Sequence, residues 1–168
     1  MKTKTLDLGC GRTPKNFWGA DEVWGIDILS DPKNKNVKVA DLVVEPIPFN
    51  DDTFDYITAH DFLEHVPRIL YVAGSGSLVR IQPFINLMNE IFRALKQGGK
   101  FLSFTPAYPQ KEAFTDPTHV NVITEETFPL YFCKEHLWAS SYGFNGQFVL
   151  ELQQWQGPHL ISILSKPY

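Results

Sequence analysis

Short apolar runs, each closed by a polar or glycine-containing segment, recur through the first third of the chain. They cover Thr5–Gly9, Glu22–Ile28, Val37–Leu42 and Phe54–His60, and they are rich in β-branched or aromatic residues. Runs of this length between turn-forming residues are typical of buried β-strands. We therefore predict a strand in each run.

A helical periodicity replaces this pattern in Gln82–Gly99. Apolar side chains recur there at intervals of three and four residues, at Phe84, Leu87, Met88, Ile91, Phe92 and Leu95. This spacing predicts a helix. Gly98–Gly99 is suited to be its C-cap, and Lys96 to face the negative end of its dipole. A further strand is expected at Lys100–Pro106.

Two other segments carry weaker helical signals. Phe62–Tyr71 begins like a helix, but Pro67 and then Ala73–Ser77 interrupt it. A short helix is expected over roughly Glu125–Glu135, because Thr124 can cap it and acidic residues suit its first turn.

The chain ends in two apolar runs, Phe148–Trp155 and His159–Lys166, which flank the turn-forming residues Gln156–Pro158. This arrangement predicts an antiparallel hairpin. Strands joined to helices, with a hairpin last, indicate an open α/β sheet that is mostly parallel, with about seven strands. Such sheets bind ligands beyond the carboxyl ends of their strands.

The connections after the first two strands are too short and too polar for full helices. Arg12–Asp21 contains a proline and a glycine, and Leu29–Asn36 is largely polar. One face of the sheet should therefore be thinly covered. We expect Phe17, Trp18 and Trp24 to cover it, or a second subunit in a homodimer.

Composition limits the classes of protein to consider. The 168 residues suit a single domain spanning residues 1–168, and 43% are hydrophobic. A net charge of −4 argues against binding nucleic acid by charge alone. No apolar run approaches the ~20 residues of a membrane span, and no signal peptide opens the chain. Cys10 and Cys133 suit reduced thiols, so we expect a cytoplasmic protein that does not contact membranes.

The first strand runs into a glycine loop, LDLGCGRTP, at Leu6–Pro14. In a dinucleotide-binding fingerprint a third glycine would stand where this chain has Pro14, and a helix would follow to hold the pyrophosphate. A Gly-Lys-Ser/Thr phosphate loop is also missing from this segment. The loop therefore does not favour a phosphate ligand, and a nicotinamide oxidoreductase is disfavoured.

Three acidic residues lie on consecutive predicted strands. Asp27 ends the second strand, where an acid can accept both ribose hydroxyls of a nucleoside. Asp41 ends the third, where it could meet an adenine amino group. Asp7, inside the first strand, can orient the glycine loop through backbone N–H groups. Each could instead be a surface acid or a turn acceptor, but together they predict a nucleoside site.

Taken together, these segments resemble class I S-adenosylmethionine-dependent methyltransferases, of the small type 11 kind. LDLGCG resembles the family's first motif, and GID its acidic second-strand end. Val37–Val66 resembles the run through the third and fourth strands, and Phe92–Pro106 the helix, turn and fifth strand. The family implies a Rossmann-like sheet whose last strand is antiparallel. This chain departs from it in lacking the upstream helix and in its reduced first crossover helices.

The resemblance also implies positions for S-adenosylmethionine. Gly9, Cys10 and Gly11 would contact its methionine moiety, Asp27 its ribose, and Ile28, Asp41 and Leu42 its adenine, while His60 and Phe62 would close the site. The implied reaction is methyl transfer to an acceptor that we expect to be a small molecule or carbohydrate-like. The alternative is a non-catalytic binding or assembly module that retains the cofactor site.

Polar residues at the expected acceptor side are Asp61, Glu64, His65, Asp116 and His119. His119 is a candidate general base, since an unperturbed histidine titrates near pH ~6.5. Asp116 could instead be a turn acceptor while His119 packs locally, and His65 more often has a structural role in this family. His60, His65 and His119 could form a metal site, but no ligand-spacing motif supports one, so no metal site is expected.

Overall fold

A mixed seven-stranded sheet forms the centre of the structure, a computed structural model that describes residues 2–29 and 32–168. Its strand order is β3-β2-β1-β4-β7-β9-β8. The strands are β1 Lys4–Leu8, β2 Glu22–Asp27, β3 Val37–Val39, β4 Phe54–His60, β7 Leu95–Pro106, β8 Val149–Gln156 and β9 His159–Ser165. The neighbouring strands β3, β2, β1, β4 and β7 pair in parallel, and β9 runs antiparallel to both β7 and β8. The predicted mostly parallel sheet with a C-terminal hairpin is confirmed.

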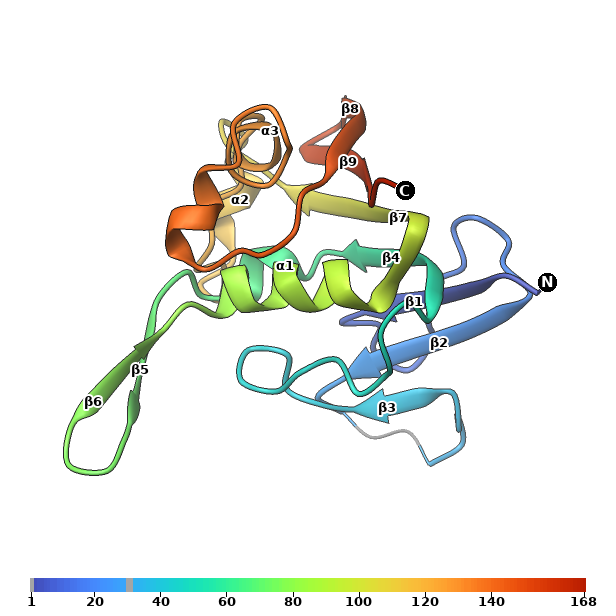
Figure 1. The fold of residues 1–168 in the computed structure, drawn as a ribbon, viewed down its shortest axis with the longest axis horizontal. Coiled ribbons are helices and arrows are strands. Elements are labelled where there is room, and N and C mark those ends of the chain that lie inside the picture. The colour runs from blue at the N-terminus through green and yellow to red at the C-terminus, as the bar shows by residue number, and fades with distance from the viewer. Residues whose placement is uncertain (1, 30–31) are drawn as a thin grey trace.

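Helix α1 (Pro83–Ala94) packs across one face of this sheet (Figure 1). Proline suits its first turn because the N–H that it lacks has no partner inside the helix. The apolar stripe of the helix joins the alternate sheet residues that point the same way, in one core that includes Leu6, Leu8, Ile57, Phe84, Leu87, Met88, Ile91 and Phe101. Short helices flank this core: η1 Leu63–His65, α2 Glu112–Thr115, α3 Thr127–Tyr131 and η2 Trp138–Tyr142.

The end of α1 differs from the prediction. The helix stops at Ala94, and Leu95 is already extended and pairs with Phe54 of β4. Gly98 has a φ of 74° and donates its N–H to the carbonyl of Lys166, far along the chain. The predicted Gly98–Gly99 C-cap is therefore wrong, because pairing with β4 and β9 extends strand β7 back through these glycines.

Two other predicted elements are shorter in the structure. Strand β3 ends at Val39, because the following residues turn: Val44 and Glu45 both donate to the Asp41 carbonyl. Helix α3 covers only Thr127–Tyr131, and its N-cap is Glu126 without a side-chain capping hydrogen bond, so the predicted cap by Thr124 is wrong. The Thr124 hydroxyl accepts from the Glu126 amide in the turn that precedes the helix.

The segment after β4 forms a hairpin that the sequence did not predict. A single 3-10 turn, η1, precedes Pro67, and then β5 (Leu70–Ala73) pairs antiparallel with β6 (Leu78–Ile81). The predicted interruption at Ala73–Ser77 is the tip of this hairpin. Figure 1 shows it projecting from the body beyond the carboxyl ends of the central strands. Its apolar side chains Tyr71, Leu78 and Val79 are exposed.

The sheet face opposite α1 is thinly covered, as predicted. Residues 9–21, all within the described part of the chain, contain no helix between β1 and β2. Trp18 stacks on Tyr56 of this face with ring centroids 4.7 Å apart, and Phe17 lies edge-on to Trp18. Trp24 instead contacts Phe49 and the main core. The prediction that Trp24 covers the thinly covered face was wrong. Trp24 pairs with Leu6, whose side chain lies in the main core, and paired residues point to the same side of a sheet.

Among the described residues, no helix has both the length and the apolar character needed to cross a membrane. The assignment of residues 1–168 to one domain and the cytoplasmic location stay predictions.

Candidate functional site

The glycine loop ties the ends of β1 and β2 together. The Cys10 amide donates to the Ile26 carbonyl (3.1 Å), and the Gly11 amide donates to Oδ2 of Asp27 (2.8 Å). Gly9 and Gly11 both have positive φ, 64° and 59°. A Cβ on Gly9 would lie 2.4 Å from the Phe62 ring, whereas one on Gly11 would meet no atom within 4 Å. The loop is thus packed on one side and open on the other.

Asp7 lies beneath this loop and is almost fully buried. Its Oδ1 accepts from the Thr58 hydroxyl (2.6 Å) and lies 3.4 Å from Nδ1 of His60, while Oδ2 accepts from the Lys15 amide (2.8 Å). Asp7 therefore fixes the chain that leaves the loop, through a backbone N–H as expected. His60 faces Asp7 rather than the pocket described next.

A pocket of about 460 Å³ opens at the carboxyl ends of β1, β2 and β3. Its lining residues are Gly9, Ile26, Asp27, Ile28, Leu29, Ala40, Asp41, Leu42, Val43, Asp61, Phe62, His65 and Val66. The structure thus brings together six of the residues predicted for the cofactor: Gly9, Asp27, Ile28, Asp41, Leu42 and Phe62. The other four, Asp7, Cys10, Gly11 and His60, do not line this pocket.

Two of the three carboxylates at the pocket, Asp27 and Asp41, already accept backbone hydrogen bonds. Oδ1 of Asp27 accepts from the Leu29 amide (2.9 Å), and Oδ1 of Asp41 accepts from the Val43 amide (3.0 Å). Each ionised carboxylate has about four lone-pair sites, so capacity for further donors remains on both. Asp41 is thus a turn acceptor that also faces the pocket.

Apolar side chains flank the acids at the pocket mouth. Ile28 and Leu29 are 68% and 58% exposed, unusually high for aliphatic residues directly after a buried strand. A planar ring inserted between them would remove this surface from water. Leu29 was not among the predicted site residues, because nothing in the sequence marks which loop residues stay uncovered.

The electrostatics of the pocket are acidic. Asp27, Asp41 and Asp61 line it, and no lysine or arginine does so in the described part of the chain. Burial, together with the nearby carboxylates Asp7 and Asp27, raises the pKa of Cys10 to about 12. Such a site suits a cationic ligand and disfavours a phosphate.

A second group of polar residues gathers beside this pocket, where the loop after β7 returns to η1. The amides of Val120 and Asn121 donate to the Glu64 carbonyl, which fixes this loop. The rings of His65 and His119 then lie edge to face with centroids 4.9 Å apart, and Nε2 of His119 is 4.0 Å from Oε1 of Glu64. We call Glu64, His65 and His119 the histidine cluster.

Asp116 has the turn role that was the alternative to catalysis. Its Oδ1 accepts from both the amide (2.8 Å) and the hydroxyl (2.7 Å) of Thr118. These bonds, the hydroxyl first, lower the pKa of the exposed Asp116 carboxyl. Thr118 in turn contacts Nδ1 of His65 at 3.0 Å, so Asp116 acts on the histidine cluster through Thr118.

One contact at the site links the end of β4 to the C-terminal hairpin. Asp61 has a left-handed φ of 50°, and its Oδ1 lies 2.8 Å from Nε2 of His159. His159 also stacks on Phe104, with centroids 4.2 Å apart. Only the register of β9 against β7, which puts His159 opposite Pro106, brings this histidine to the site.

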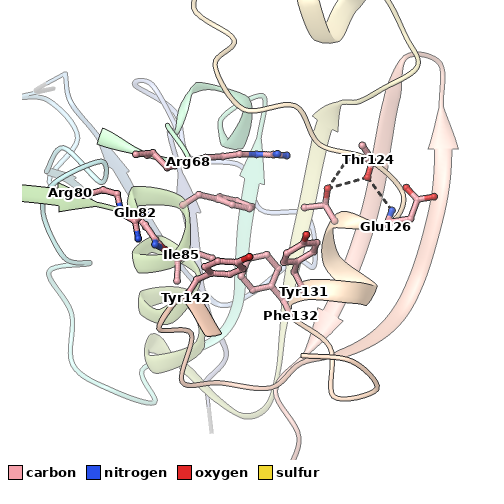
Figure 2. A pocket seen from close by; sticks show the side chains of 12 residues that line it. Arg68, Arg80, Gln82, Ile85, Thr124, Glu126, Tyr131, Phe132 and Tyr142 are labelled. Carbon is pink, nitrogen blue, oxygen red and sulfur yellow. Dashed lines mark hydrogen bonds between the residues drawn. The ribbon is translucent and has the colours of Figure 1, made fainter. Parts of the chain in front are cut away.

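A separate pocket of about 440 Å³ lies between the base of the β5–β6 hairpin, the start of α1 and helix α3. Figure 2 shows Arg68 and Arg80 on the hairpin side and the aromatic residues Tyr131, Phe132 and Tyr142 opposite. The Arg68 guanidinium is fixed by Oδ1 of Asn121 (2.7 Å). His65 and Val66 line the first pocket, and Arg68 and Ile69 line this one, so one short chain segment contributes to both.

Comparisons with known proteins agree with this arrangement. A family model described as a methyltransferase domain matches residues 2–135. A search of curated proteins gives no match.

Solved structures show the same fold. An S-adenosylmethionine-dependent methyltransferase from Mesorhizobium loti has a TM-score of 0.62 at 17% identity, over 98% of this chain and 91% of that chain. A Haloferax volcanii protein in complex with a methyltransferase activator also scores 0.62, at 13% identity, over 99% and 84%. The cyclase SpnF scores 0.59 at 15% identity, over 99% and 75%. At these identities the likeness concerns the fold alone.

The matched family model spans residues 2–135, which is most of the chain. The predicted resemblance is confirmed, and the chain belongs to the class I S-adenosylmethionine-dependent methyltransferases.

Proposed function

We propose that this chain transfers a methyl group from S-adenosylmethionine to a small-molecule or carbohydrate-like acceptor. The observation that supports this most strongly is the single pocket of about 460 Å³ in which Gly9, Asp27 and Asp41 converge without any lysine or arginine in its described lining. These residues lie at or just after the ends of three strands, β1, β2 and β3, so the convergence depends on the fold and not on one local motif.

Different residues of this pocket would bind the ribose, the adenine and the methionine moiety of the cofactor. Asp27 would accept the ribose hydroxyls, and Asp41 with Leu42 would contact the adenine edge, between Ile28 and Leu29. The methionine moiety would lie against Gly9, Cys10 and Gly11, where the space beside Gly11 is open. Phe62, packed on Gly9, would close the site.

Bound S-adenosylmethionine supplies an electrophilic methyl group on a sulfonium centre. The chain would contribute alignment of the acceptor with that methyl group and exclusion of water, which together account for much of the acceleration of an in-line displacement. The acidic lining stabilises the cationic cofactor, and Phe62 shields the reacting atoms from solvent.

A neutral acceptor hydroxyl or amine must also lose a proton, and we assign this step to His119. Nδ1 of His119 lies 3.3 Å from the Ala113 carbonyl, which can only accept a hydrogen bond. The ring proton therefore lies on Nδ1, and Nε2 retains its lone pair. Asp116 would orient His65 through Thr118, and the His65 ring would position this base by packing edge-on against it.

Binding of S-adenosylmethionine tests the proposal directly. We expect the purified chain to bind this compound and S-adenosylhomocysteine in calorimetry and thermal-shift measurements. Asp27→Ala should weaken binding roughly tenfold or more, because it removes charge-assisted hydrogen bonds to the ribose. The matched variant Asp51→Ala, at an exposed acid away from the pocket, should bind normally. Stabilisation by NAD alone would overturn the proposal.

A binding or assembly module is the second candidate, and the projecting β5–β6 hairpin favours it. Its exposed Tyr71, Leu78 and Val79 resemble a contact surface more than part of an enzyme core. One measurement distinguishes the enzyme from the binding module. Formation of S-adenosylhomocysteine with any member of a broad acceptor panel supports the enzyme, whereas cofactor binding without turnover across the panel supports the module.

A further inference from the structure

Glu64 is a buried carboxylate with one oxygen unused. The residue is 1% exposed, and Oε2 accepts a 2.7 Å hydrogen bond from the Thr105 hydroxyl. Oε1 is buried and has no hydrogen-bond partner among the described residues. A buried polar atom without a partner is costly, and a carboxylate more so. Within the described part of the chain, no group at hydrogen-bonding distance supplies a proton or a positive charge to Oε1.

The His119 ring faces Oε1 of Glu64 but lies beyond hydrogen-bonding distance of it. Nδ1 of His119 lies 3.3 Å from the Ala113 carbonyl, an acceptor, so the tautomer that donates there turns the lone pair of Nε2 toward Oε1, 4.0 Å away. Two groups rich in electrons thus face each other across a gap too long for a hydrogen bond.

His65 also has one ring nitrogen that donates a hydrogen bond and one that keeps its lone pair. Its Nδ1 lies 3.0 Å from the Thr118 hydroxyl, whose own proton goes to Oδ1 of Asp116 at 2.7 Å. Nδ1 of His65 must therefore donate, which leaves the lone pair on Nε2. Metal-binding histidines show this same arrangement, with the second ring nitrogen donating to a carbonyl or a carboxylate-bound group.

We propose that Glu64, His65 and His119 bind a divalent transition-metal ion such as Zn²⁺. One ligand atom from each residue lies within 4.8 Å of the others. Around tetrahedral zinc, ligand atoms are about 3.4 Å apart, given bonds of about 2.1 Å. Side-chain adjustments of the order of 1 Å would bring the three together. Two imidazoles and one carboxylate select zinc over magnesium, which prefers oxygen ligands.

Zinc bound by these three residues would keep its fourth coordination position free for water or an acceptor oxygen. His65 also lines the cofactor pocket, so this position would lie at the edge of that pocket. Zinc lowers the pKa of a bound water to about 7, and would activate an acceptor hydroxyl likewise. His119 would then be a ligand instead of the proton acceptor. This consequence rests on the proposed function, whereas metal binding itself does not.

The experiment is a Zn²⁺ titration of the full chain, freed of metal with EDTA and dialysed, without S-adenosylmethionine. Calorimetry should show one tight site per chain, and Co²⁺ should give the visible absorption of a four- or five-coordinate nitrogen and oxygen site. His65→Ala, His119→Ala and Glu64→Gln should each weaken Zn²⁺ binding at least about tenfold. His136→Ala, which removes an exposed histidine outside the cluster, should leave it unchanged.

Absence of a tight Zn²⁺ site would overturn the inference, and so would a site that survives His65→Ala and His119→Ala. Loss of the site in Cys10→Ser would also overturn it, because the ligand would then be a thiolate. Circular dichroism of each variant separates lost ligation from lost folding, and either histidine variant suffices if Glu64→Gln does not fold. S-adenosylmethionine binding by the metal-free chain tests the methyltransferase proposal separately.

Discussion

At the residue scale, both the backbone conformation of Gly9 and the Phe62 side chain beside it require a glycine at this position. Its left-handed φ of 64° would strain any other residue, and the Phe62 ring occupies the space of a Cβ. The glycine therefore lets Phe62 close over the loop. Sequence reasoning identified the glycine, but not the ring that needs it.

We predict that Gly9→Ala weakens S-adenosylmethionine binding by roughly tenfold or more and lowers the free energy of unfolding by about 2–4 kcal/mol. Backbone strain accounts for about 1–2 kcal/mol and the displaced Phe62 for the rest. Calorimetry and urea unfolding measure the two effects. Gly157→Ala is the matched control, since Gly157 has a φ of 59° in the hairpin turn and open space around it. Equal losses in both variants would contradict the role of Phe62.

The two cysteines should react slowly at pH 8. Burial, with nearby carboxylates, raises the pKa of Cys10 to about 12 and that of Cys133 to about 11. Since the thiolate is the nucleophile, the reactive fraction is small in the folded chain and much larger at the ordinary pKa of about 8.5. We expect Ellman's reagent to label the native chain at least about a hundredfold more slowly than the urea-unfolded chain. Rapid labelling of either native thiol would contradict this.

At the element scale, long-range pairing decided where elements begin and end. The periodicity of Gln82–Gly99 correctly predicted a helix, but the helix ends earlier than expected. Leu95 pairs with Phe54 of β4, and the Gly98 amide donates to the carbonyl of Lys166. Local sequence cannot show this competition, because the competing partners lie far away in the chain. The same holds for β5–β6, whose pairing uses residues without clear alternation.

Asp55 joins three elements at this end of the sheet. Its carboxylate accepts from the Lys4 amide of β1 (2.8 Å) and from Lys96 of β7 (2.9 Å). Burial acts to raise the pKa of Asp55, but these hydrogen bonds prevail and hold the pKa below its usual value.

We predict that Asp55→Asn lowers the free energy of unfolding at pH 7 by about 1–2 kcal/mol. Because the folded-state pKa is depressed, the stabilisation is present above the unfolded pKa of about 3.9 and is lost as the pH falls below it. Urea unfolding at pH 7 and near pH 3 should therefore show a difference that shrinks in acid. Glu135→Gln, at an exposed acid, should show little change at either pH, and a difference for Asp55→Asn that is independent of pH would refute the explanation.

At the scale of the whole molecule, the thinly covered sheet face leaves apolar side chains exposed. Leu152 and Ile163 are paired neighbours on that face, and Leu152 is 40% exposed. Phe17, beside Trp18 over the same face, is 57% exposed. Apolar surface of this kind on a sheet favours burial against another chain.

We predict that the chain forms a homodimer through this face. Sedimentation velocity should give the dimer mass at micromolar concentration, and Phe17→Glu should shift it to monomer by placing a charge in the contact. Tyr71→Glu, on the projecting hairpin, is the control and should remain dimeric. A wild-type chain that sediments as a monomer at these concentrations would contradict the prediction.

The sequence by itself determined which segments form the central strands and that acids follow their carboxyl ends. Period-two patterns and glycine turns are local, and parallel strands necessarily bring Asp27 and Asp41 to one edge. Only the tertiary structure decided which polar atoms remain without partners. Thr118 and His65 meet across 53 residues of sequence, and this contact fixes which nitrogen of His65 keeps its lone pair. The histidine cluster could not be predicted from spacing, because hydrogen-bond partners and side-chain directions are set by packing between distant segments.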